Sequence, residues 1–232
     1  MPSWKALGPG IEYRTLGCDD KTHTFALHLL RVDPRRVPLK AVVTEPAHVE
    51  DVVRSQNALF GLNANFFDDK RRPLGVALEN GKPLNRPHPV VWMSIFAIYE
   101  DGRPEILLSS RWNHARSGAR MAVQAGPRIV VDGELTHIKP TGPSRRSGVC
   151  IQSPKQVVFF VTPGNHFLTV EEIAALGQRS ETSEGMGCRD AMLFDGGGSA
   201  QFYLHGQPDA IEVFGDEVPA FLIGGSMESG SN

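Results

Sequence analysis

Cysteine, long hydrophobic runs and net charge are all scarce in this sequence. The three cysteines, Cys18, Cys150 and Cys188, are far apart in the 232 residues, and no Cys-x-x-Cys pair occurs. This spacing argues against a zinc site and against a dense disulfide framework. We therefore expect three ordinary buried thiols, with a single disulfide as the alternative.

Metal-binding patterns are also missing. The eight histidines form no His-Glu-x-x-His motif and no close pair, so each is expected to be a surface or core residue rather than a metal ligand. We expect no metal site and no cofactor, and a divalent ion stays open as an alternative.

The sequence has no segment suited to a membrane and no charge excess suited to nucleic acid. No stretch approaches the roughly 20 apolar residues of a transmembrane helix, and the opening "MPSWKALGPGIEYRTLG" lacks the apolar centre of a signal peptide. The formal net charge is −2. We expect no membrane insertion and no nucleic-acid partner. The protein is then either cytoplasmic, or periplasmic or secreted after removal of a leader.

Turn-forming residue pairs separate many short apolar runs. Asn80-Gly81, Asp101-Gly102 and Asp132-Gly133 each lie between two such runs, and residues 153–155 occupy a similar position. These pairs are typical of β-hairpins, so the pattern predicts mostly antiparallel pairing. The predicted strands lie near residues 24–32, 37–43, 58–63, 74–79, 90–99, 105–109, 120–124, 128–131, 146–152, 156–162, 191–195, 200–204 and 219–223.

Two segments have helical patterns. Residues 169–177 begin with Thr169 as an N-cap, and Glu172 completes a capping box three residues later. Gly177 is placed to end this helix.

The second helix is predicted over residues 46–57. Pro46 suits a first helical turn, and valines at positions 49, 52 and 53 form an apolar stripe. Together the strands and helices predict an α+β fold, with a mainly antiparallel, strongly curved sheet and two principal helices.

One polar segment follows an apolar run at residues 191–201, "AMLFDGGGSAQ". Successive glycines let the backbone approach a ligand closely and can direct several N–H groups at one anion, which favours a phosphate or carboxylate ligand. The segment is not a P-loop, because no lysine follows Ser199, and Gln201 does not fit a Gly-x-Ser-x-Gly elbow. The alternative is a glycine-rich turn between two strands, capped by Asp195.

Two other polar segments are candidates for a site. In "NANFFDD", Asn63 and Asn65 are suited to orienting a polar ligand, and Phe66 and Phe67 to lining a sugar. The alternative for this segment is a strand end with core aromatics. The arginine pair at positions 145 and 146 is suited to phosphate if it points inward, and is otherwise a solvated loop charge.

Five segments taken in order resemble the phosphodiester glycosidase family. They are "LNANFF", "VQAGPRIVVDG", "RRSGVCI", "LTVEEIAALG" and "LFDGGGSAQF". The resemblance runs from about residue 58 to the C-terminus and is weaker over residues 1–57, which are interpreted as part of the same single domain, 1–232. Cys150 stands where the family often has glycine, and Ser147 where it often has threonine or asparagine.

The resemblance implies a hydrolase that cleaves the sugar C1–O bond of a glycosyl-1-phosphodiester. The family's best-known member removes N-acetylglucosamine from a phosphodiester, and the substrate here is expected in a cell envelope or an exported glycan. The partner is then a small molecule or glycan carrying a sugar-1-phosphate diester. A non-catalytic carbohydrate- or phosphoglycan-binding module and a phosphodiesterase that cuts P–O stay open as alternatives.

The resemblance also assigns roles to residues of this chain. As catalytic residues it implies Asp195 at the anomeric carbon, Arg146 on the phosphate and Asn63 on the sugar. Asp68 is a spare carboxylate. The implied substrate-binding residues are Gln124, Asn65, Phe67, Gly196, Gly197, Gly198, Ser199 and Arg128.

Overall fold

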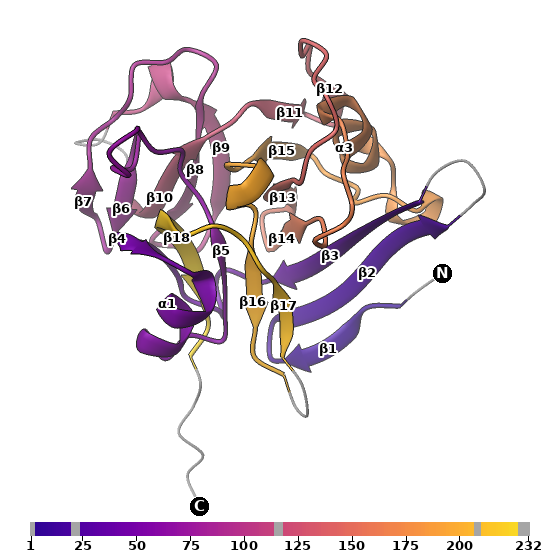
Figure 1. The fold of residues 1–232 in the computed structure, drawn as a ribbon, viewed down its shortest axis with the longest axis horizontal. Helices are drawn as coiled ribbons and strands as arrows, with labels where there is room; N and C mark the ends of the chain where they lie inside the picture. The colour runs from indigo at the N-terminus through magenta and orange to yellow at the C-terminus, as the bar shows by residue number, and fades with distance from the viewer. Residues whose placement is uncertain (1–2, 20–23, 114–117, 207–209, 227–232) are drawn as a thin grey trace, which may run out of the picture.

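The structure is a computed structural model that describes residues 3–19, 24–113, 118–206 and 210–226. Every strand pairing among these residues is antiparallel, and the α-helices are α1 (Val49–Ser55) and α3 (Val170–Gln178). The predicted α+β class with mainly antiparallel pairing is therefore confirmed. The strands are divided among three sheets (Figure 1).

The largest sheet has eight strands in the order β1-β2-β3-β14-β13-β15-β11-β12. Its strands are β1 (Lys5–Gly8), β2 (Ile11–Asp19), β3 (Thr24–Val32), β11 (Arg128–Val131), β12 (Glu134–Leu135), β13 (Ser147–Ser153), β14 (Gln156–Val161) and β15 (Asp190–Leu193).

Two five-stranded sheets complete the β structure, in the orders β7-β6-β10-β8-β9 and β17-β16-β5-β18-β4. The strands of the first are β6 (Ala77–Glu79), β7 (Lys82–Asn85), β8 (Ser94–Tyr99), β9 (Pro104–Leu108) and β10 (Ala119–Ala125). Those of the second are β4 (Leu39–Ala47), β5 (Phe60–Asn63), β16 (Phe202–Leu204), β17 (Ile211–Val213) and β18 (Val218–Gly224).

The predicted hairpin turns are all present. Asn80 and Gly81 have φ of 48° and 71°, and Asp132 and Gly133 have φ of 51° and 80°, the left-handed conformation that a two-residue hairpin turn requires. The sequence patterns missed β1, β2, β7, β12 and β17. These strands are short or carry charged residues among the apolar ones, which weakens the alternation on which the prediction rests.

Both helices were predicted, but their ends differ. The capping box of α3 is present, since Thr169 accepts a hydrogen bond from the backbone of Glu172 and the Glu172 carboxylate accepts one in return. Gly177 does not end α3. It lies within the helix, where a Cβ would be 3.2 Å from Cγ2 of Val130 in β11. The glycine is explained by this close helix–sheet contact rather than by a C-cap.

Helix α1 begins at Val49, with His48 as its N-cap. Pro46 does not occupy the first turn, because it lies in β4. The valine stripe is buried as predicted. It packs against Phe221 and Tyr203 from β18 and β16.

The main apolar core lies between the sheets and takes large side chains from all three, including Phe159 of β14, Phe96 of β8 and Phe60 of β5. A second cluster joins the other face of the eight-stranded sheet to α3 (Figure 1). None of the helices in the described part of the chain has the length and apolar character needed to span a membrane.

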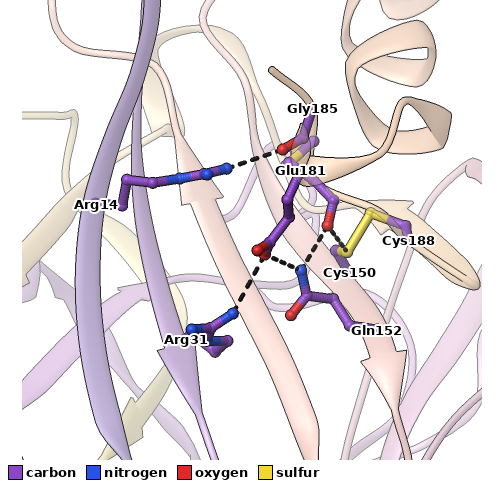
Figure 2. The surroundings of a disulfide bond; sticks show 8 residues. Arg14, Arg31, Cys150, Gln152, Glu181, Gly185 and Cys188 are labelled. Carbon is purple, nitrogen blue, oxygen red and sulfur yellow. Dashed lines mark hydrogen bonds and ion pairs between the residues drawn. A yellow bond between two sulfur atoms is a disulfide. The ribbon is translucent and has the colours of Figure 1, made fainter. Parts of the chain in front are cut away.

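A disulfide links Cys150 of β13 to Cys188, just before β15 (Figure 2). The expectation of three free thiols was therefore wrong. The two cysteines are 38 residues apart in sequence, and their Cα atoms are only 5.4 Å apart in the fold. This proximity depends on the turn between α3 and β15, which spacing alone does not predict.

Polar side chains beside the disulfide tie the N-terminal strands to the same turn (Figure 2). Arg14 of β2 donates 2.8 Å to the carbonyl of Gly185, and Arg31 of β3 pairs with Glu181 at 3.3 Å. Gln152 donates 2.6 Å to the Glu181 carboxylate. The weakly matched N-terminal strands are thus joined to the family-like part of the chain.

Candidate active site

Three strands of the eight-stranded sheet bring charged residues to one edge. Arg146 directly precedes β13, Asp195 is the second residue after β15, and Arg128 begins β11. Because β15 pairs antiparallel with both neighbours, the start of β13, the end of β15 and the start of β11 meet at the same edge. Asp195 therefore lies between Arg146 on one side and Arg128 on the other.

The main chain of Asp195 is fixed by three hydrogen bonds. Its N–H donates 3.1 Å to the carbonyl of Ala64. Its carbonyl accepts 2.6 Å from Nδ2 of Asn63 and 3.1 Å from Oγ of Ser147. The end of β5 and the start of β13 thus hold Asp195 in place.

The carboxyl group of Asp195 is strongly perturbed. Burial raises its pKa to about 6, against the smaller opposing effects of hydrogen bonds from the Ser199 side chain and the Gly196 backbone. Desolvation acts this way because it disfavours the charged form. A half-buried carboxyl group with such a pKa is a candidate for a catalytic role.

Asn63 contacts Asp195, but through the backbone carbonyl, so its role is to position Asp195. Its Oδ1 accepts 3.2 Å from the backbone N–H of Gln201, and its Nδ2 is the donor to Asp195 described above. The side chain is buried. Direct contact between Asn63 and a sugar, as implied by the resemblance, is therefore not supported by this geometry.

Asn65 is also buried and holds the neighbouring loop. Its Nδ2 donates to the carbonyls of Leu74 and Val76 at 3.0 and 2.9 Å. Its Oδ1 has no partner among the described residues. Asn65 thus shapes the wall near the site and retains one free acceptor.

Most of the Arg146 guanidinium holds the loops beside it. Its Nε donates 2.9 Å to the carbonyl of Leu168, and Nη2 donates to Oγ1 of Thr141 and the carbonyl of Gly142 at 3.1 and 2.9 Å. Burial lowers its pKa, partly offset by the charge of Glu171. Nη1 has no partner in the described part of the chain, and a Cβ at Gly196 would lie 3.8 Å from it.

The glycine turn uses several of its own N–H groups. Gly197, with φ of +63°, donates 2.9 Å to the carbonyl of Arg145. Ser199 and Ala200 donate within the short 3₁₀ turn η3 (Gly197–Ser199). A nest of four free N–H groups is thus not present, and the N–H of Gly196 is already directed at the Asp195 carboxylate.

Asp216 lies against the other end of the turn. Its carboxylate fills the space that a Cβ at Gly198 would need, so a negative charge occupies this side. Arg145 faces it and donates to the carbonyls of Ala200 and Phe214, while burial lowers the pKa of Arg145. Gly198 is therefore explained by close packing rather than by phosphate contact.

Gln124 lies in the buried interior of β10 and is saturated with protein partners. Its Oε1 accepts from the backbones of Val76 and His88 at 2.9 and 3.0 Å. Its Nε2 donates to the carbonyl of His88 and to Oγ of Ser109 at 2.8 and 3.1 Å. Gln124 therefore supports the wall of the site and has no free polar atom for a sugar.

A substitution distinguishes a supporting role of Gln124 from direct contact with a sugar. Gln124→Glu replaces a donor by an acceptor opposite the His88 carbonyl and buries a carboxyl group, so we expect a loss of about 2–4 kcal/mol of unfolding free energy. The substrate KM of the folded fraction should change little. Urea titration and steady-state kinetics measure both, and Gln156→Glu, at the exposed first residue of β14, is the matched control. A normal stability with a greatly raised KM would instead indicate direct sugar contact.

The two aromatic residues predicted to line a sugar, Phe66 and Phe67, have different surroundings. Phe67 packs into the cluster around α1, and Arg71 covers its ring at 5.1 Å. Phe66 instead meets the exposed Trp92 edge-on, with ring centroids 5.5 Å apart. Trp92 lines a pocket of about 510 Å³ that also includes Arg128. Arg128 is thus placed at a cavity, as a substrate-binding role requires.

Asp68 is not a spare carboxylate. It pairs with Arg72 at 2.6 Å and accepts the backbone N–H groups of Lys70 and Arg72. These hydrogen bonds from Arg72 hold the pKa of Asp68 below its usual range. Asp68 therefore stabilises an exposed turn.

Several residues of the site were missed from the sequence. Gln201 links Asn63 to the start of α1 through a 2.7 Å bond to the Val49 backbone, and its polarity within an apolar run was an available signal. Asp216, and Ser94 in the same pocket as Trp92 and Arg128, carried no local pattern. No group of three His, Cys, Asp or Glu side chains suited to a metal ion occurs within the described ranges.

A sequence model of the phosphodiester glycosidase family matches residues 56–221, more than half of the chain. The chain belongs to the phosphodiester glycosidase family. The family match covers the segments that hold Asn63, Arg146 and Asp195. A search of the curated proteins found no match.

Solved structures share the fold at low sequence identity. The catalytic domain of zebrafish N-acetylglucosamine-1-phosphodiester alpha-N-acetylglucosaminidase, auto-inhibited by its pro-peptide, has a TM-score of 0.74 and 15% identity, covering 97% of this chain and 86% of that one. A hypothetical protein from Synechocystis has a TM-score of 0.68 and 11% identity, covering 97% of this chain. This chain spans 63% of the Synechocystis chain. These likenesses show the fold.

Proposed function

We propose that this chain hydrolyses the C1–O bond of a glycosyl-1-phosphodiester. The observation that carries the proposal is the largely desolvated carboxyl group of Asp195, whose next residue in the chain lies near a guanidinium. Asp195 has its pKa raised to about 6, and Nη1 of Arg146 reaches the next residue, Gly196. Membership of the phosphodiester glycosidase family supports the same chemistry.

The reaction breaks the bond between C1 of the sugar and the bridging oxygen, whose electron pair leaves with the phosphate monoester. Water supplies the hydroxyl group that C1 gains, and its proton passes to solvent or to the released phosphate. Positive charge develops on C1 in such a transition state, and ionised Asp195 stabilises it. A phosphate monoester is a good leaving group, so charge neutralisation by Arg146 takes the place of a second carboxylic acid.

The other residues position this pair. Asn63 and Ser147 fix the Asp195 backbone, and Ser199 donates to its carboxylate. These contacts hold the carboxylate before substrate arrives, which reduces reorganisation in the transition state. Placement of the substrate in a cell envelope or an exported glycan stays a prediction from the resemblance.

Isotope labelling tests the proposal. Hydrolysis of a panel of sugar-1-phosphodiesters in oxygen-18 water should place the label in the released sugar. Label in the phosphate product would show P–O cleavage instead. Absence of turnover on the whole panel, with and without chelator, would support a binding module.

Arg146→Lys tests the phosphate contact. Lysine keeps the charge but cannot bond the Leu168 carbonyl, the 141–142 loop and a phosphate at once. We expect kcat/KM to fall about 10²-fold and unfolding free energy to fall by about 1–2 kcal/mol. Steady-state kinetics and thermal melting check both, with exposed Arg189→Lys as the control. An unchanged kcat/KM in Arg146→Lys would exclude the phosphate role.

A further inference from the structure

The pocket at the start of β11 combines an aromatic wall, a buried hydroxyl group and a basic rim. Its volume is about 510 Å³, and its lining includes Trp92, Ser94, Arg128, His137 and Lys139. The resemblance drew attention to Arg128 alone. The other lining side chains add an aromatic surface, a hydroxyl group and further basic groups to the pocket.

Two residues that line the pocket bond the end of β15 and the Arg146 guanidinium. Pro127 lines it and accepts 3.0 Å from the backbone of Leu193 at the end of β15. Thr141 also lines it and accepts from Nη2 of Arg146. The pocket thus extends from β11, the neighbour of β15 in the sheet, to the residue that contacts the Arg146 guanidinium. With the phosphate at Arg146 and C1 at Asp195, the proposed function places the sugar ring at this pocket.

We propose that this pocket binds the glycosyl ring and prefers a sugar that carries a carboxylate, such as a uronic acid. The inference rests on the proposed function, because that function orients the substrate. It departs from N-acetylglucosamine, the neutral sugar that the resemblance suggested.

Trp92 and Ser94 supply the contacts to the ring. Trp92 is 50% exposed, and its edge-on contact with Phe66 fixes the indole orientation. An aromatic face packs well against the apolar face of a sugar. Ser94 is fully buried at the start of β8, and its Oγ has no partner in the described part of the chain. A buried hydroxyl group without a partner gains from a hydrogen bond to a ligand hydroxyl.

The basic residues of the rim account for the preference for a sugar that carries a carboxylate. Arg128, His137 and Lys139 are basic, and the described residues that line the pocket include no carboxylate. Arg128 and Lys139 form no ion pair with the described residues. Two permanent positive charges without acidic partners attract an anionic ligand and raise its affinity over that of a neutral ligand.

Binding of simple glycosides tests the pocket without relying on turnover. We would measure dissociation constants for methyl glucuronide, methyl glucoside and methyl N-acetylglucosaminide, in both anomeric forms, by titration calorimetry. We expect the glucuronide to bind at least tenfold more tightly than the neutral sugars at low salt. Arg128→Gln and Lys139→Gln should each reduce this preference severalfold, whereas Lys155→Gln, in a turn at another site, should leave it unchanged. Trp92→Ala should weaken the binding of all three sugars.

The results separate this inference from the proposed function. Hydrolysis is measured in parallel on the methyl phosphodiesters of glucuronic acid 1-phosphate and glucose 1-phosphate. Turnover of both at equal kcat/KM, without a binding preference, overturns the acidic-sugar inference and leaves the function standing. A glucuronide preference that depends on Arg128 and Lys139, without any turnover, rejects the function and supports the pocket. No detectable binding of any sugar overturns the inference.

Discussion

Replacing Asp195 by asparagine is expected to reduce turnover at least 10³-fold while the protein stays folded. Asparagine keeps the shape and can still accept from Ser199 and Gly196, but it carries no negative charge to stabilise C1. Single-turnover kinetics measure the loss, and substrate binding should survive. Asp190→Asn, at the other end of β15, is the control and should retain normal activity.

The same substitution should increase stability above pH 6. Burial raises the pKa of Asp195 from its ordinary value of 3.8 to about 6. A raised carboxyl pKa means that the folded state binds more protons than the unfolded state between these values, so wild-type stability falls as pH rises from about 4 to about 6. Asparagine does not ionise, so the variant keeps this stability as the pH rises. Its free energy of unfolding should exceed that of wild type by up to about 3 kcal/mol at pH 8 and should equal it below pH 4.

Wild-type activity should depend on the same ionisation. If ionised Asp195 is required, kcat/KM falls about tenfold per pH unit below pH 6. Urea titrations of both proteins at pH 4 and pH 8 measure the stability change. A variant that is less stable than wild type at pH 8, with activity retained, would make Asp195 a turn cap and contradict its catalytic role.

Removing the disulfide is expected to have the largest effect on stability. The bond closes a loop of 38 residues between Cys150 and Cys188, and loop-closure entropy for this length corresponds to about 4 kcal/mol. The double variant Cys150→Ala/Cys188→Ala should therefore melt about 8–15 °C below wild type. Its folded fraction should still turn over substrate, because neither cysteine contacts the catalytic pair.

Reducing agent provides the internal control for this experiment. Wild-type protein in excess dithiothreitol should melt near the double variant, and the double variant should not respond to dithiothreitol. If wild type and variant melt together without reductant, the disulfide contributes nothing to stability in solution.

The sequence by itself determined the elements that depend on local physics. The Asn80-Gly81 and Asp132-Gly133 turns adopt left-handed conformations that few other residue pairs accept, so they mark hairpins wherever they occur. The capping box at Thr169 is equally local, because its partners are three residues apart. The ordered motifs likewise sufficed for the family.

Tertiary structure decided what each polar residue does. Asn63 and Gln124 were both predicted as sugar ligands, yet Asn63 bonds the backbone of a residue 132 positions away. Gln124 saturates its amide against loops 36 and 48 positions away. A buried amide must find partners somewhere, but which partners it finds depends on the approach of distant strands.

The disulfide and the proposed sugar pocket also depend on contacts between distant parts of the sequence. Cys150 and Cys188 meet because the turn after α3 returns to β13, and no spacing rule encodes that return. Ser94 begins β8, Trp92 precedes that strand and Lys139 lies in the loop after β12, so no sequence motif holds them together. Local patterns determine strands, turns and caps because their interactions span a few residues. The site depends on long-range packing, and only the assembled sheets show which side chains face one another.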